Sequence, residues 1–577
     1  MAMSLIHIIL LFLTTAVYMA VGRMVFTHTS LSPLYASPFG CFMLGVGVWF
    51  LWFLVFHGFL GASLPVVWYT FLVSTLALSV VLTRILHTSY ENPLFWPKVL
   101  VGLMLTLPVF WALRSDTPML WAELGHILKN TAHLLEFSAI PNAESAQPFG
   151  MESPLSQLGI PLMSLPIMMM ANSFLPAVPA MFSVIIYILV GAELIRQCKV
   201  YVRPHNLVAF SVVGLVGVSL LNPFFINSIV FSAYPDVFIA ALLLAISLPL
   251  MDENPLPTGL GLLPYGVFLA LLPALTPLSL PLILFFAFAY TFLLWRDGGF
   301  ASGAIRTISG LSILLFIPLF AGFGLLYMAQ KLGHQIWQGD LLFEHLFNPL
   351  LLVSGFFQGF QAVAMSALAK PTIGLIVVLL LFIAGLRVIN LKFGESLDVL
   401  FAQKRQILLP SLLFIFYAVL CGGTYLASLS PKTTFPTQGG LHYLLHLQFL
   451  FLLPLWIWIH NAYSALVPQQ KDSVSGGASF MMSLVFLAFL LVNSNTIRQQ
   501  PFAPLAHTQQ VANALRADNT LVEWTSRVAV LDGTATKGYY AHALAYGLRH
   551  HAYVRPVLQS FADAEGQFNV FHDALLQ

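Results

Sequence analysis

The feature that most limits how this chain can fold is its succession of long apolar runs, separated by short polar stretches. Many of these runs approach the twenty or so residues that an α-helix needs to cross the hydrocarbon layer of a bilayer. Of the 577 residues, 59% are hydrophobic and 8% are charged, and one water-soluble core cannot absorb that much apolar surface. The sequence therefore predicts an all-α polytopic membrane protein. A formal net charge of +2 provides no basic footprint, which excludes a nucleic-acid partner.

The apolar runs predict about fourteen membrane spans. With this set of spans, most Lys and Arg of the connecting loops fall on one side, which the positive-inside rule makes cytoplasmic, so both termini are expected outside. Two more apolar stretches, 155–171 and 348–369, then have to be re-entrant or interfacial. The expected spans lie near 4–22, 38–56, 64–83, 99–113, 178–195, 207–221, 237–251, 259–274, 281–295, 309–329, 371–386, 407–427, 443–460 and 478–494.

Three parts are expected from the changes in composition along the chain. Residues 1–98 form N-terminal membrane helices, 99–495 form the main transmembrane part, and 496–577 form a small outside domain. This tail is richer in charge than the rest, and its alternation of apolar and polar residues predicts a small α/β layer. The outside loops expected in the main part are 114–177, 222–236, 331–370 and 427–442.

The outside segment that starts at Asp116 has the strongest pattern for a functional site. An acid at the membrane boundary is costly unless it is solvated or paired, so Asp116 is a candidate functional residue. The residues after it have apolar side chains at helical spacing, which predicts an amphipathic helix along the interface. A turn-rich stretch and a second apolar helix follow, so the segment can wall a cavity at the membrane surface.

Several stretches together resemble one bacterial branch of the GT-C superfamily of glycosyltransferases. Asp116 and Trp121-Ala122 stand at the spacing of that branch's first outside loop, and Ile140-Pro-Asn142 matches its turn. Glu152 to Gly159 takes the position of the next helix start, Tyr234-Pro-Asp236 matches a Tyr-x-Asp motif, and Gly440 to His446 matches a late loop. The chain departs from the pattern at Thr117, His126 and His442, where Glu, Lys and Arg are usual.

The resemblance implies an inverting transfer of a sugar from a polyprenyl-phosphate donor to a glycan, lipid or protein acceptor such as pilin. The sugar could be a pentose such as arabinofuranose. Asp116 is expected to be the general base, and Asp236 to orient the acceptor, hold a sugar hydroxyl or help to bind a divalent cation. The implied site faces the periplasm in a bacterial inner membrane. Further substrate-binding candidates are Trp121, His126, Lys129, Glu152, Tyr234, Lys432, His442 and Tyr443.

Other interpretations of the same residues stay open. Asp116 and Asp236 could each cap a helix, and Trp121 could be an interfacial anchor. His442 and His446 lie one helical turn apart, a spacing that metal ligands also use, although no HExxH pattern accompanies them. The alternative functions are an enzyme like an O-antigen ligase or polymerase, and a transporter or flippase of lipid-linked substrates. The loop 331–370 contains no Arg, which counts against the ligase.

Overall fold

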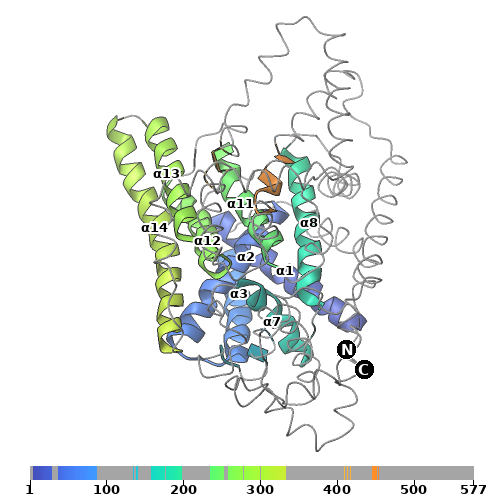
Figure 1. The fold of residues 1–577 in the computed structure, drawn as a ribbon. Coiled ribbons are helices and arrows are strands. Elements are labelled where there is room, and N and C mark those ends of the chain that lie inside the picture. The colour runs from blue at the N-terminus through green and yellow to red at the C-terminus, as the bar shows by residue number, and fades with distance from the viewer. Residues whose placement is uncertain are drawn as a thin grey trace, which may run out of the picture.

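A computed structural model gives the fold, and all regular structure in the residues that it describes is helical (Figure 1). The α-helices are α1 (Leu5–His28), α2 (Pro38–Phe53), α3 (Leu64–Leu86), α7 (Gly159–Ala171), α8 (Val178–Gln197), α11 (Asp236–Met251), α12 (Leu263–Leu271), α13 (Ser279–Gly298) and α14 (Phe300–Lys331). A π-helix, η1 (Leu54–Phe59), continues α2, and the 3₁₀ turns η4 (Gly259–Leu262) and η5 (Leu272–Ala274) flank α12. The structure describes residues 4–28, 37–86, 131, 134–135, 138–140, 158–173, 175, 177–197, 234–251, 256, 258–276, 279–298, 300–332, 409, 412–413, 416, 445–450 and 452–453.

Three of the described helical stretches are long and apolar enough to cross a membrane. They are Leu5–Phe26, Pro38–Phe59 and Thr307–Lys331, each with a mean hydropathy of 2.2 in its most apolar window. Shorter apolar helices pack around them. This composition is compatible with a membrane protein, as the apolar runs predict.

The described helices coincide with predicted apolar runs. The run at 178–195 is α8, and the run at 259–274 is one continuous helical stretch made of η4, α12 and η5. The stretch at 155–171 contains α7, whose residues are buried from Gly159 to Met168, so α7 lies within the bundle rather than on its surface. The total of about fourteen spans and the α/β tail at 496–577 stay predictions, because the tail and most residues of the remaining runs lie outside the described residues.

The tightest helix pair is α1 with α2, and glycine makes its close approach possible. A Cβ atom on Gly22 would collide with the backbone carbonyl of Cys41, and one on Gly45 would collide with that of Tyr18. From Gly22 back to Tyr18 in α1, the contact moves forward from Cys41 to Gly45 in α2, so the two helices run antiparallel. Small residues at such contacts are a common device for packing helices in membranes.

A proline inside α7 explains how that helix is joined to α1 and α2. Pro166 has no N–H, so the carbonyl of Leu162, four residues earlier, lacks its helical partner. The indole Nε1 of Trp49 in α2 donates to this carbonyl at 2.9 Å. The hydroxyl of Tyr18 in α1 donates to the neighbouring carbonyl of Met163 at 3.1 Å. Side chains of both helices thus satisfy backbone groups of the third.

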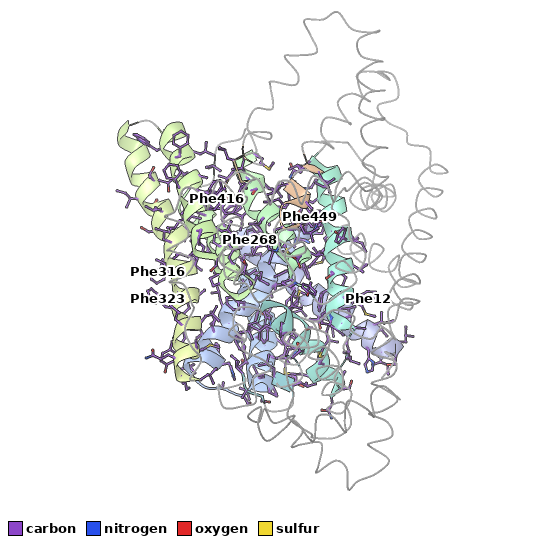
Figure 2. All side chains as sticks on the ribbon, in the orientation of Figure 1. Phe12, Phe268, Phe316, Phe323, Phe416 and Phe449 are labelled. Atoms are coloured by element: carbon purple, nitrogen blue, oxygen red, sulfur yellow. The ribbon has the colours of Figure 1, made fainter. Side chains whose placement is uncertain are left out.

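α14 forms one outer side of the described helices, packed on α12 and α13 (Figure 1). Its early residue Gly310 contacts Leu262 and Leu294, whereas its late residue Met328 contacts Gly58 at the end of η1. Figure 2 shows Phe316 and Phe323 projecting outward from α14, and these side chains are 70% and 66% exposed. Such a face is suited to contact with lipid chains.

Candidate functional site

Asp236 is the described acidic residue that both the sequence and the structure single out. It is the first residue of α11, directly after Tyr234-Pro235, and the carbonyl of Pro235 accepts the first helical bond from Ile239 N–H at 2.8 Å. A carboxylate in the first turn of a helix is stabilised by the positive end of the helix dipole. Its side chain is nevertheless buried, so the carboxylate is surrounded by protein and not by water.

The carboxylate of Asp236 contacts the imidazole of His446, 210 residues later in the chain. Nε2 of His446 lies 3.1 Å from Oδ1 of Asp236, the geometry in which an imidazole N–H donates to a carboxylate. The two side chains are 5% and 4% exposed. Because an ionisable group in an apolar bundle is costly without a partner, this contact helps to compensate the burial of the acid.

A second polar contact joins the same part of the chain to α8. The hydroxyl of Tyr187 donates to Oε1 of Gln448 at 2.9 Å, and both groups are buried. The ring of Phe449 packs edge-on against the Tyr187 ring, with centroids 5.2 Å apart. Residues 445–450 are therefore held against α8 and α11 together. We call Tyr187, Asp236, His446 and Gln448 the Asp236 cluster.

One member of the Asp236 cluster, Tyr187, lies at the middle of α8. Tyr187 is the tenth residue of a helix that runs from Val178 to Gln197, about 15 Å from either end at the usual helical rise. Figure 2 places the label of Phe449 beside α8, within the bundle. The cluster is thus enclosed by helices, with a carboxylate, an imidazole, an amide and a phenol gathered among apolar side chains.

A separate buried carboxylate lies at the C-terminal end of α8. Arg196 forms a bidentate contact with Glu193. Its Nε donates to Oε2 at 3.0 Å, and its Nη2 donates to Oε1 at 2.5 Å. Gln197 donates to Oε1 at 2.7 Å, and the hydroxyl of Ser37, which caps the start of α2, also donates to Glu193. Four donors around one carboxylate make this an ion pair that ties α8 to α2.

Of the residues predicted from the sequence as site residues, the structure describes Tyr234 and Asp236. Tyr234 is partly buried directly before α11, and Asp236 belongs to the cluster. The others lie outside the described residues, so their positions stay predictions: Asp116, Trp121, His126, Lys129, Glu152, Lys432, His442 and Tyr443.

Sequence reasoning did not predict Tyr187, Glu193 or Gln448 as site residues. Tyr187 and Glu193 stand inside a predicted span, and Gln448 stands inside another, where a polar side chain is itself a signal of a buried contact. The spacing of His446 from His442 is one that metal ligands also use, whereas the structure shows His446 in contact with Asp236.

Metal binding has limited support within the described part of the chain. There, no three His, Cys, Asp or Glu side chains come together in a way that could hold a metal ion. Asp236 and His446 supply two groups of types that bind divalent cations, and most protein sites for such ions use more ligands.

The polar contacts among the described helices are the basis for any functional assignment of this chain. The site consists of a buried acid–imidazole contact, a phenol–amide contact beside it, and an ion pair farther along α8. Against this chain, no model of a protein family, no curated protein and no solved structure gives a match.

Proposed function

We propose that the chain is an integral-membrane glycosyltransferase of the GT-C type, which transfers a sugar from a polyprenyl-phosphate donor to a glycan, lipid or protein acceptor. One observation supports this more than any other. The resemblance singles out Tyr234-Pro-Asp236 and Gly440–His446 separately, and a 3.1 Å contact joins Asp236 to His446. Two distant motifs that meet in space are expected when both serve one site.

The proposed chemistry follows from the donor. The acceptor hydroxyl gives its proton to the carboxylate of Asp116, and its oxygen bonds to the anomeric carbon of the sugar. The bond from that carbon to the phosphate oxygen breaks, and polyprenyl phosphate leaves with the electron pair. Lys129 and Lys432 would stabilise the departing phosphate. Asp236 would orient the acceptor or a sugar hydroxyl, and the site would face the periplasm of a bacterial inner membrane.

The test is a transfer assay on the purified full-length protein in detergent, with polyprenyl-phosphate sugars that include a pentose donor such as arabinofuranose. We expect Asp116→Asn to abolish transfer, because an amide cannot accept the proton, while donor binding is kept. We expect Asp236→Asn to reduce transfer at least about 100-fold through misplacement of the acceptor. Full activity of Asp116→Asn would remove the assigned base. Mass spectrometry of glycans and pili from cells with and without the gene would identify the product.

A transporter of lipid-linked substrates is a second candidate, and the depth of the Asp236 cluster favours it. Transporters place their substrate and ion sites near the middle of the membrane, beside interrupted helices. Tyr187 of the cluster stands at the middle of α8, and His446 stands in a turn between helical residues. Reconstituted vesicles separate the two functions. Movement of the lipid-linked sugar without a covalent product would support the transporter, and covalent transfer supports the enzyme.

A further inference from the structure

We propose that His446 is a positioning residue, whose imidazole holds the Asp236 carboxylate in its working orientation, and that the Tyr187–Gln448 contact fixes His446 for this task. This inference rests on the proposed function, because it assigns a role within the same site. It adds to the site three residues from two further segments of the chain.

The first step of the argument is the isolation of Asp236 from water. Its side chain is 4% exposed and that of His446 is 5% exposed, so neither can exchange its partner for solvent in the packed structure. A carboxylate can rotate about its χ angles unless a directional contact stops it. A charge-assisted N–H···O contact at 3.1 Å is such a contact, and it sets the direction of the carboxylate plane.

The second step concerns what holds the imidazole. His446 lies in a turn, and the short helical stretch that follows it contains Gln448 and Phe449. Gln448 accepts from the Tyr187 hydroxyl, and Phe449 packs on the ring of that same tyrosine. Two different contacts to one residue of α8 therefore fix the backbone of residues 445–450. The imidazole of His446 therefore contacts Asp236 from a backbone that is held in place.

The third step is that the neighbours of His446 cannot replace it. Leu445, Leu447, Phe449 and Leu450 are apolar and buried, and none of them carries a side-chain donor. Loss of the imidazole would remove this directional contact from the carboxylate, and a shift of about 1 Å in a reacting group can cost about 100-fold in rate. The effect should appear in kcat more than in KM, because donor binding uses other groups.

The experiment compares three variants of the full-length protein in the transfer assay. His446→Leu removes the donor, and we expect kcat to fall about 100-fold with KM for the donor within about 3-fold of wild type. His446→Gln places an amide N–H near the original Nε2, and we expect it to keep kcat within about 10-fold. Tyr187→Phe deletes the contact that fixes the segment, and we expect an intermediate loss of kcat.

A matched control separates positioning from a general loss of stability. Trp49→Phe deletes another buried hydrogen bond, to Leu162 in α7, away from the Asp236 cluster. We expect it to lower the melting temperature in detergent and to leave kcat unchanged. The inference is overturned if His446→Leu keeps wild-type kcat, or if His446→Gln is as inactive as His446→Leu, because a donor at that position would then not matter.

A second readout does not depend on transfer. A hydrophobic carbodiimide modifies buried carboxyl groups, and mass spectrometry locates the adduct, with Asp236→Asn as the blank. We expect modification of Asp236 to be several-fold greater in His446→Leu than in the wild type or in His446→Gln. Equal modification in all three would overturn the role of His446. A wild type without transfer would instead overturn the proposed function, and the labelling result would still stand.

Discussion

At the scale of single residues, several buried polar side chains of the described helices are held by specific partners. Asp236 contacts His446, Tyr187 contacts Gln448, and Glu193 contacts Arg196. The acidic member of the first pair could be predicted from the sequence, because an acid beside a predicted span attracts attention by its cost. Its partner His446 could not be predicted, because 210 residues separate the two and the local sequence does not indicate which distant turn packs against Asp236.

The ion pair at the end of α8 leads to a prediction about stability. The Glu193 side chain is 0% exposed and that of Arg196 is 31% exposed, so removing the arginine takes the counter-charge from a buried carboxylate and leaves it the neutral donors Gln197 and Ser37. We expect Arg196→Leu to lower the free energy of unfolding by about 3–5 kcal/mol. The measurement is reversible unfolding in detergent, or the melting temperature where unfolding is irreversible.

The double variant Glu193→Leu/Arg196→Leu is the control for this prediction. Exchange of a complete buried ion pair for apolar residues is often close to neutral, so we expect the second substitution to restore most of the lost stability. If the double variant were less stable than Arg196→Leu alone, the loss of stability in Arg196→Leu would not come from a buried carboxylate without its arginine partner.

At the scale of the helices, the extents of the elements followed from the sequence better than their irregularities did. The runs at 178–195 and 259–274 ended within a few residues of the observed helices, because long apolar runs bounded by polar residues leave little choice. The π-helix η1 was not predicted. There Nδ1 of His57 lies 2.8 Å from the carbonyl of Ala62, a contact that depends on how the helix end folds back.

The antiparallel contact of α1 with α2 predicts a strong sensitivity to one methyl group. A Cβ at Gly45 would meet the backbone carbonyl of Tyr18, which cannot move without the helix. We expect Gly45→Ala to separate the two helices and to cost about 1–3 kcal/mol of stability. Thermal unfolding of the purified variant in detergent measures this cost.

The matched control for Gly45 is Gly322, in α14. A Cβ there would meet nothing within 4 Å among the described residues. Because alanine favours a helix over glycine, we expect Gly322→Ala to be neutral or stabilising by up to about 1 kcal/mol. Equal losses in the two variants would show that steric contact is not the cause.

At the scale of the whole molecule, the contacts define two ends of the described bundle. Met328 near the end of α14 contacts Gly58, and Gly310 contacts Leu262 in the turn before α12. Eighteen residues separate these two points of α14, about 27 Å of helix and close to a hydrocarbon thickness. Which end faces the outside stays a prediction from the basic residues of the sequence. Asp116 and most residues of the predicted outside loops lie outside the described residues.

Cysteine labelling can test this arrangement in cells. Ser63 and Lys331 are exposed at one end of the bundle, and Thr258 is exposed at the other. After replacement of Cys41, Cys198 and Cys421 by Ala, we expect Ser63→Cys and Lys331→Cys to react with an impermeant maleimide in intact cells. Thr258→Cys should react only after permeabilisation. Ser63→Cys and Thr258→Cys labelled from the same side would contradict a transmembrane orientation of α14.

The hydrogen bonds that Trp49 and Tyr18 donate to α7 have a mechanical consequence. Because they satisfy carbonyls of Leu162 and Met163, α7 cannot slide or rotate against α1 and α2 without stranding polar groups in an apolar interior. These two hydrogen bonds therefore oppose sliding of α7 against α1 and α2. The helix ends at Asn172, whose left-handed backbone conformation stops it directly after this anchored part.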